Sequence, residues 1–449
     1  MRLLGIRYPW INLHIWRHDN IISAMKSPCP KEIPTPWLRV IGIGEDGLAG
    51  LGEAARQTLC QARVLFGGAR HLAMVPSHPD QIRQTWPSPF SAAHDALLAY
   101  RGQPVVVLAS GDPMFHGVGA TLARWFGAAE MRVLPAASAA SLAAARLGWA
   151  LHEIKVIPAH REPLEGLALH LAPGARLLVL SRDADTPAQL SKLLVAHGYG
   201  ESQLARLERL GGPEEGMAES RANAWSHPPG AALNLVAVTC RADAGARCLS
   251  RRAGLPDDAF EHDGQLTKRD MRAMVLARLA PAHGERLWDV GAGCGSIGIE
   301  WLRTGNRCQA IAVESHPGRC ALIRANRARL GVPELELIEG RAPAALAGLE
   351  RPDAIFIGGG LTRPGVVEHC WEALKPGGRL LATAVTLESE LLLTTLYQRH
   401  GGELIRVALA QAEPLGGFQS WQPARPLTLL ALTKVTPEQT PCTPEDGRR

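Results

Sequence analysis

The sequence predicts two α/β domains in tandem, and three observations support this. A chain of 449 residues is longer than one hydrophobic core usually serves. Short runs rich in Val, Leu and Ile alternate with amphipathic helical segments along most of the chain. The alternation breaks once, in the charged, Gly- and Pro-containing stretch RADAGARCLSRRAGLPDDAFEHDG. We therefore expect one domain over 37–242, a linker over 243–258 and a second domain over 259–435.

The two ends of the sequence lack the pattern of a packed domain. Residues 1–36 show no clear periodicity and finish in the Pro-rich stretch SPCPKEIPTP, so we expect a poorly ordered extension. The tail 436–449 is polar and Pro-rich, and we expect it to be disordered.

Strands and helices alternate within each predicted domain. In the first, GEAARQTLCQARVL and ASLAAARLG are helical in pattern, and the strand-like runs are LRVIGIG, VVVLASG, LLVLS and LNLVAVTC. In the second, the strand-like runs are RLWDVGAG, QAIAVES, LELIEG, DAIFIGGG, RLLATAVT, ELIRVALA and LTLLALTK. The last of these runs follow one another without a long helix, which indicates an antiparallel end to the second sheet.

Composition narrows the function classes. The net charge of +5 is a small excess for this length and gives no dense basic stripe, which argues against a nucleic-acid partner. The nine cysteines form no C-x-x-C pair and no set with zinc spacing, so no metal site is expected. No apolar run is long enough to span a bilayer, and we expect a cytoplasmic protein without a membrane partner.

The most specific motif is WDVGAGCGSIGIEW, residues 288–301. A hydrophobic strand ends near Asp289, and Gly291, Gly293 and Gly295 lead into a helix. Glycines let a ligand lie against the backbone, and the helix N–H groups supply hydrogen-bond donors. The spacing Gly293-x-Gly295-x-x-Gly298 also fits dinucleotide sites, so the pattern alone leaves NAD and S-adenosylmethionine open.

Neighbouring residues favour S-adenosylmethionine. A carboxylate at Asp289 suits the methionine ammonium, directly or through water, and would repel a pyrophosphate. Glu314 ends the next strand, from which an acid accepts ribose hydroxyls. The segment LKPGGRLL supplies a helix stop and a turn into a strand, as in Rossmann-like methyltransferases. We also assign Gly340 and Ala342, at the end of LELIEG and just after it, to the cofactor site.

A second glycine-rich constellation lies in the first domain. Gly42 and Gly44 follow a strand, and LASGDPMFHGVGA places Gly111, Asp112 and Pro113 after another. A tight turn at Asp112 and Pro113 exposes backbone that can grip an adenosine or methionine moiety. These five residues are the predicted cofactor-binding set of the first domain.

The motifs resemble two known families. The first domain, with FGGARHL and LERLGGPEE, is similar to the tetrapyrrole methylase family over about 37–240. The second, with LTKRDMRAMVLARL, IFIGGG and AVTLES, resembles the decarboxylating precorrin methyltransferase domain over about 255–435. The resemblance implies a two-lobed tetrapyrrole methylase domain followed by a Rossmann-like class I methyltransferase domain, each with its own S-adenosylmethionine.

The resemblance also implies an activity: C-methylation of precorrin-6 (6B/6Y) at C5 and C15 with decarboxylation of the C12 acetate, in cobalamin biosynthesis, by a homo-oligomer. By the same resemblance Glu388 and Thr386 are the expected catalytic residues. The substrate is a polycarboxylate, for which Lys268, Arg269 and Arg272 are candidate partners. A solvated helix face is the alternative reading of these three cations.

Two other functions remain open from the sequence alone. A Rossmann-type oxidoreductase with NAD(P) satisfies both glycine patterns, and saturable binding of S-adenosylhomocysteine without NAD(P) binding would exclude it. An RNA-modifying methyltransferase with an appended module is the second alternative. A strongly salt-dependent affinity for RNA would favour it.

Overall fold

The computed structural model describes residues 36–435. The predicted tail and, apart from Pro36, the predicted extension lie outside this range. Contacts divide the chain into two compact units, Met1–Ser138 and Ala139–Arg449. The division falls inside the predicted first domain and not in the predicted linker, so the domain limits 37–242, 243–258 and 259–435 stay predictions. None of the helices described between residues 36 and 435 is long and apolar enough to cross a membrane.

The first unit is built on a parallel sheet with strand order β3-β2-β4-β1-β5. Its strands are β1 (Leu38–Ile43), β2 (Val64–Gly67), β3 (Ile82–Thr85), β4 (Val105–Ser110) and β5 (Met131–Leu134). Its helices are α1 (Glu53–Cys60), α2 (Ala69–Ala73), α3 (Ala93–Leu98) and α4 (Val118–Phe126). The central strand β4 is buried on both faces, with Val105 and Val107 in one apolar cluster and Val106 and Leu108 in another.

The second unit begins with a mixed sheet of order β6-β7-β10-β8-β9. Its strands are β6 (Ile154–Ile157), β7 (Arg176–Leu180), β8 (Gln203–Glu208), β9 (Gly216–Arg221) and β10 (Asn234–Thr239). Two helices accompany it, α5 (Ala139–Leu147) and α6 (Thr186–Ala196). Strand β10 pairs antiparallel with β7 and with β8, whereas β6 and β7 are parallel.

A seven-stranded sheet of order β13-β12-β11-β14-β15-β19-β16 follows in the same unit. The strands are β11 (Arg286–Val290), β12 (Gln309–Glu314), β13 (Glu336–Glu339), β14 (Ala354–Ile357), β15 (Arg379–Ala384), β16 (Glu403–Val407) and β19 (Leu427–Thr433). The first five are parallel, and β19 runs antiparallel to β15 and β16. This confirms the predicted α/β class and the antiparallel end of the sheet.

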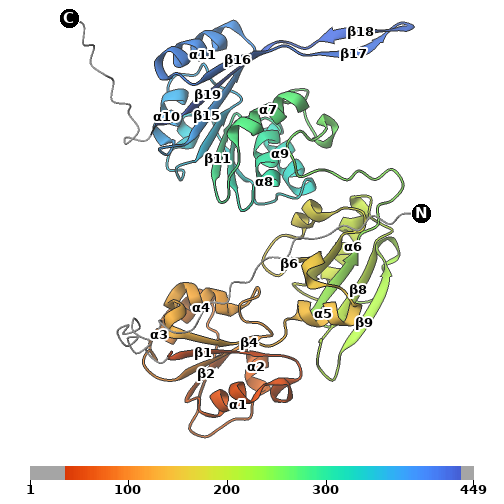
Figure 1. The fold of residues 1–449 in the computed structure, drawn as a ribbon, viewed down its shortest axis with the longest axis vertical. Coiled ribbons are helices and arrows are strands. Elements are labelled where there is room, and N and C mark those ends of the chain that lie inside the picture. Colours follow the sequence, from red (N-terminus) through yellow and green to blue (C-terminus); the bar gives the residue numbers. More distant parts are fainter. Residues whose placement is uncertain (1–35, 436–449) are drawn as a thin grey trace, which may run out of the picture. The chain divides into compact units, whose positions relative to one another are not determined.

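Helices cover both faces of this sheet (Figure 1). They are α7 (Arg269–Leu279), α8 (Ser296–Thr304), α9 (Pro317–Arg329), α10 (Val366–Ala373) and α11 (Leu387–His400). Along β12, Ala310 and Ala312 pack with α7, α8 and α9, while Ile311 and Val313 pack with α10 and α11. Because alternate residues point to opposite faces, this strand needs apolar side chains throughout.

A hairpin of β17 (Ala410–Leu415) and β18 (Phe418–Pro423) projects beyond β16 (Figure 1). Its strands pair only with each other in the described sheets, and every residue in them is exposed. This hairpin was not predicted from the sequence, because without a buried face it has no apolar alternation.

Candidate functional site

A large pocket opens at the carboxyl ends of the parallel strands β11 to β15. Its volume is about 1190 Å³, which exceeds the roughly 300–1,000 Å³ of a site for one drug-sized ligand. The strand order reverses between β11 and β14, the place where open α/β sheets bind ligands. The wall residues at the ends of these strands or just after them are 290–293, 313–315, 340–342, 358–360, Thr383 and Val385.

The glycine loop after β11 has a backbone that only glycine adopts easily. Gly291, Gly293 and Gly295 have φ values of +68°, +60° and +83°. A Cβ atom on Gly291 would also lie 2.6 Å from the Cα atom of Gly359. The loops after β11 and β14 therefore touch through bare backbone, and Gly295 directly precedes the first turn of α8.

Glu314 ties the glycine loop to the end of β12. Its carboxylate accepts hydrogen bonds from the backbone N–H groups of Gly293 (2.9 Å), Ser315 (2.8 Å) and His316 (2.9 Å). The side chain is largely buried and lines the pocket. Since two carboxylate oxygens offer about four acceptor positions, one remains for a ligand hydroxyl.

Asp289 lies behind the loop and not on the pocket wall. It is 1% exposed, and its Oδ2 accepts a hydrogen bond of 2.9 Å from the N–H of Gly298 on α8. Its Oδ1 is buried without a hydrogen-bond partner in the described part of the chain. Burial, and then the nearby charge of Glu314, raise the pKa of Asp289 to about 7. Because Asp289 does not line the pocket, we do not keep the predicted direct contact between its carboxylate and the methionine ammonium of the donor.

The other C-terminal candidates divide between the wall and its surroundings. Gly340 and Ala342 line the pocket, and the Gly340 N–H donates to the Glu314 carbonyl (2.9 Å). Thr386 and Glu388 are exposed and are not among the wall residues. The Thr386 hydroxyl accepts a hydrogen bond from the backbone N–H of Ser389 and caps α11. A catalytic role for Thr386 and Glu388 therefore stays a proposal.

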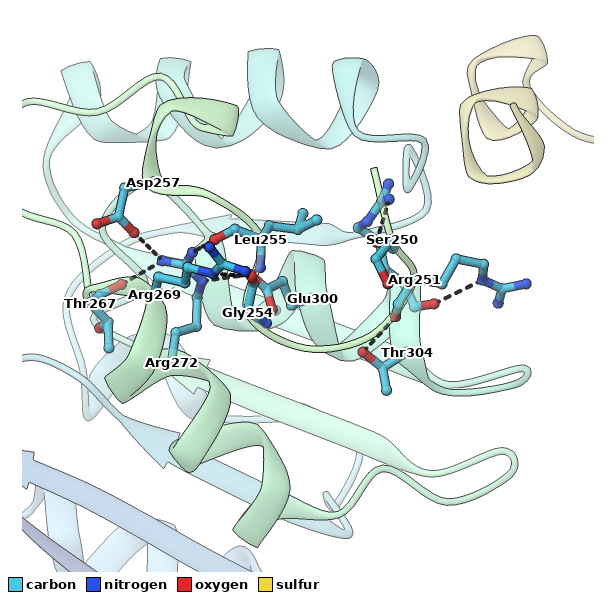
Figure 2. Close-up of polar contacts among 12 residues, drawn as sticks. Ser250, Arg251, Gly254, Leu255, Asp257, Thr267, Arg269, Arg272, Glu300 and Thr304 are labelled. Carbon is cyan, nitrogen blue, oxygen red and sulfur yellow. Dashed lines mark hydrogen bonds and ion pairs between the residues drawn. The ribbon is translucent and has the colours of Figure 1, made fainter. Parts of the chain in front are cut away.

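The three predicted substrate cations also separate. Lys268 and Arg269 line the pocket, whereas Arg272 does not. Arg272 is fully buried and is held by Glu300 and Asp257 (Figure 2). Because its guanidinium is committed to protein partners, we correct its assignment as a substrate contact and keep that proposal for Lys268 and Arg269.

Three arginines that the sequence analysis did not single out stand on the pocket wall. Arg341, Arg363 and Arg425 are exposed, and no described residue forms an ion pair or a side-chain hydrogen bond with them. Each lies in a loop at the pocket end of the sheet, after β13, after β14 and before β19. That placement is the signal that would have found them, once the strands had been assigned.

The predicted residues of the first unit also come together. The Gly111 N–H donates to the Ile43 carbonyl (3.0 Å), which joins the ends of β4 and β1. A Cβ atom on Gly42 would lie 2.6 Å from the backbone nitrogen of Ala136, and Gly111 has a φ of +51°. Asp112 closes the following turn, since its carboxylate accepts from the Met114 N–H (2.9 Å). The loop that begins at Gly44 and the Gly111–Pro113 turn thus both lie at the carboxyl end of the same parallel sheet.

A polar cluster that was not predicted also lies at the carboxyl end of this sheet. His71 Nε2 lies 2.9 Å from Ser110 Oγ and 2.9 Å from the Arg70 guanidinium, which also pairs with Glu45. Burial and then the Arg70 charge lower the pKa of His71 to about 4. The ring is therefore neutral at physiological pH. Arg70 and His71 belong to the segment FGGARHL, which was used above only for the family resemblance.

Two family models match the chain in the predicted order. The model of tetrapyrrole (corrin/porphyrin) methylases matches residues 38–224, and that of the precorrin methyltransferase domain matches residues 258–434.

Similar proteins span nearly the whole chain. Precorrin-6Y C(5,15)-methyltransferase [decarboxylating] of Sinorhizobium sp is 50% identical over 406 residues, which are 90% of this chain and 97% of that protein. The protein of the same name from Mycobacterium tuberculosis is 43% identical over 400 residues, 88% of this chain and 99% of its own length.

Among solved structures, the C-terminal domain of precorrin-6Y C5,15-methyltransferase from Rhodobacter capsulatus is 47% identical. It covers 41% of this chain and 100% of its own, with a TM-score of 0.40. The relatives at 50% and 43% identity match along almost their entire length, through both glycine-lined regions. The chain belongs to the family of decarboxylating precorrin-6Y C5,15-methyltransferases.

Proposed function

We propose that this chain uses S-adenosylmethionine to methylate precorrin-6Y at C5 and C15 and decarboxylates the C12 acetate, in cobalamin biosynthesis. The observation that carries the proposal is the 50% identity to a relative of that name over 97% of its length. Neither an oxidoreductase nor an RNA-modifying enzyme is among the relatives described above.

The C-terminal pocket fits the methyl donor. The backbone of the loop after β11 would hold the methionine part, because residues 290–294 line the pocket and the positive φ values of Gly291 and Gly293 shape this loop around it. The free acceptor position of Glu314 suits a ribose hydroxyl. The donor, when bound, supplies an electrophilic methyl group, so the residues around it have to orient two reactants and keep water out.

A second donor site in the first unit is supported by its own glycines. Gly42 and Gly111 let the backbones after β1, β4 and β5 approach one another at the carboxyl end of the parallel sheet, and the Asp112–Pro113 turn follows. Two independent donor sites would explain how one chain methylates two carbons. We assign one methylation to each.

The cations of the C-terminal pocket suit a polycarboxylate substrate. Arg341, Arg363 and Arg425 have no acidic partner among the described residues. Lys268 and Arg269 also line the pocket, although Lys268 lies 3.8 Å from Asp257 and Arg269 donates to the Gly254 carbonyl. An arginine without a partner binds a carboxylate in a bidentate manner at little structural cost. The volume of about 1190 Å³ leaves room for part of a macrocycle beside the donor.

We keep Glu388 and Thr386 as the proposed catalytic pair on the strength of the family motif. Thr383 and Val385, which precede them, do line the pocket. A ligand that fills the pocket would therefore end close to the start of α11. Replacing Glu388 by Gln tests this role, because loss of turnover with unchanged donor affinity is the expected result.

We also propose that the protein is a cytoplasmic homo-oligomer without a nucleic-acid partner. The β17–β18 hairpin exposes Leu415, Phe418 and Trp421 at 66%, 80% and 73%. Such a concentration of exposed apolar side chains is typical of a surface that another chain covers. Sedimentation of the W421D variant should show a smaller assembly than the wild type.

Mass spectrometry of the reaction tests the whole proposal. Precorrin-6Y incubated with the full chain and S-adenosylmethionine should gain two methyl groups and lose one carbon dioxide. Omitting the donor provides the control for the two methyl groups. An unchanged substrate mass in the presence of an active donor would contradict the proposal.

A further inference from the structure

Residues 254–267, here called the strap, form part of the wall of the C-terminal pocket. Pro256, Asp257 and the run 265–267 line it. The carbonyl oxygen of Gln265 lies 3.7 Å from the position that a Cβ atom on Gly293 would take. The strap therefore borders the glycine loop, where the donor is proposed to bind.

One buried ion pair holds both ends of the strap (Figure 2). Arg272 on α7 donates from Nε to Glu300 on α8 at 2.6 Å, and both side chains are buried. At the first end, Glu300 accepts from the N–H groups of Gly254 (2.6 Å) and Leu255 (3.0 Å), and Arg272 donates to the Leu255 carbonyl (2.5 Å). At the second end, Arg272 donates to the Thr267 carbonyl (2.5 Å). The two ends are thus fixed to the same pair of charges.

The middle of the strap is joined to the glycine loop itself. Asn326 on α9 is fully buried and exchanges two hydrogen bonds of 2.8 Å with the backbone of Glu261. Its side-chain nitrogen also donates to the carbonyl of Cys294 at 3.1 Å. A shift of the strap would therefore be felt at the loop between Gly293 and Gly295.

A buried ion pair is weak evidence for stability, because removing two charges from water costs about as much as their attraction returns. Apolar side chains would fill the same space at least as well. What they would not do is fix four backbone groups at both ends of one loop. The geometry points to position, and not stability, as the contribution of this pair.

We propose that Arg272 and Glu300 are positioning residues, which set the strap as one wall of the donor site for the C-terminal methyl transfer. The inference rests on the proposed function, in which this pocket binds S-adenosylmethionine. Neither residue touches the reacting atoms. They act through the strap and the glycine loop.

Hydrogen–deuterium exchange of the full chain titrated with S-adenosylhomocysteine tests the inference site by site. Protection of residues 290–297 reports the C-terminal pocket, and protection of residues 111–119 reports the first unit. In R272K the lysine still reaches Glu300 but lacks the planar fork that serves both ends of the strap. The protection midpoint is the S-adenosylhomocysteine concentration that gives half of the maximal protection. At residues 290–297 we expect it to rise about tenfold in R272K, which corresponds to the loss of one charge-assisted hydrogen bond.

Three comparisons separate positioning from damage to the fold. The midpoint at 111–119 should not move in R272K. R278K, on the same helix and paired with Glu403 outside the pocket, should match the wild type at both sites. In turnover, R272K should raise the KM for the donor while kcat at saturating donor stays close to the wild-type value, because the reacting groups are unchanged.

The outcomes are distinct. A wild-type chain whose residues 290–297 gain no protection would overturn the proposed function. Protection with the same midpoint in folded R272K would overturn only this inference. If R272K does not fold, E300Q decides, because Glu300 does not line the pocket and the amide group of Gln cannot accept both the Gly254 and the Leu255 N–H bonds that Glu300 accepts. A raised midpoint in E300Q supports the inference, and an unchanged one refutes it.

Discussion

Replacing Asp289 by Asn should stabilise the protein at pH 8 much more than at pH 5. Asp289 is 1% exposed at the end of β11, and only one of its oxygens has a hydrogen-bond partner in the described chain. An Asn side chain has nearly the same shape and keeps an oxygen for the Gly298 N–H. The substitution therefore removes the titration and changes little else.

The magnitude follows from the pKa. Burial raises the pKa of Asp289 from 3.8 to about 7, and Glu314 adds to the effect. At about 1.36 kcal/mol per pKa unit this corresponds to about 4 kcal/mol. Below pH 3.8 the carboxyl is protonated in both states and costs nothing. Between pH 3.8 and about 7 the unfolded chain releases the proton first, so the folded state loses stability, and above about 7 the loss is complete.

Between pH 5 and pH 8 the wild type should thus lose about 3 kcal/mol that D289N retains. For a domain of this size the gap between the two melting temperatures should widen by roughly 6–12 °C. Thermal unfolding of both proteins at the two pH values measures it. The exposed β13 residue Glu336, changed to Gln, is the control and should leave the gap unchanged. An equal gap at both pH values would refute the burial argument.

Other substitutions give sharp outcomes. The G291A variant places a Cβ atom at a position with a φ of +68°, 2.6 Å from the Cα atom of Gly359. Its product should gain one methyl group and retain the acetate carboxylate. The free energy of unfolding should fall by about 1–3 kcal/mol. In G42A, whose Cβ would lie 2.6 Å from the Ala136 nitrogen, mass spectrometry should show one methyl group gained and carbon dioxide lost; two methyl groups would exclude a donor site there. Changing the three unpaired pocket arginines to Ser should raise the KM for the tetrapyrrole by about tenfold or more at low salt, without moving the S-adenosylhomocysteine midpoint at 290–297. The three are Arg341, Arg363 and Arg425.

The sequence predicted the buried parts of the fold better than the exposed ones. Strand β12 has apolar residues on both faces because helices cover both sides, and such runs stand out in a sequence. Strand β9, at an edge of its sheet, reads GMAESR and alternates between partly exposed and exposed residues. The β17–β18 hairpin buries nothing. Neither the edge strand nor the hairpin was predicted, because neither has a buried face that would impose a readable period. Burial was not sufficient either: the buried strand β8 was missed, and the helix predicted over GEAARQTLCQARVL ends at Cys60, since Val64 and Leu65 belong to the buried strand β2.

The same contrast holds within the site. Gly291 and Glu314 were predicted because their roles depend on neighbours close in sequence: a backbone turn and the end of a strand. Arg272 was misassigned because its sequence context, KRDMR, resembles a solvated helix face. Its burial depends on Glu300, which lies on the next helix and reaches it only when α7 and α8 pack together. The role of a buried charged residue can therefore be assigned only when the fold shows which residue it pairs with.

Helix α8 explains why these observations concern one small region. Its first turn follows Gly295, the N–H of Gly298 is bound by Asp289, and Glu300 holds the strap through Arg272. The donor loop, the buried acid and the strap are thus attached to the first five residues of one helix, at its start, at Gly298 and at Glu300. Two of these attachments place charged groups in the protein interior, where stability alone would favour apolar side chains. Methyl transfer depends on the alignment of the two reactants more than on acid–base chemistry. The free-energy cost of burying these charges is therefore consistent with a helix that holds the loop and the strap in fixed positions around the donor.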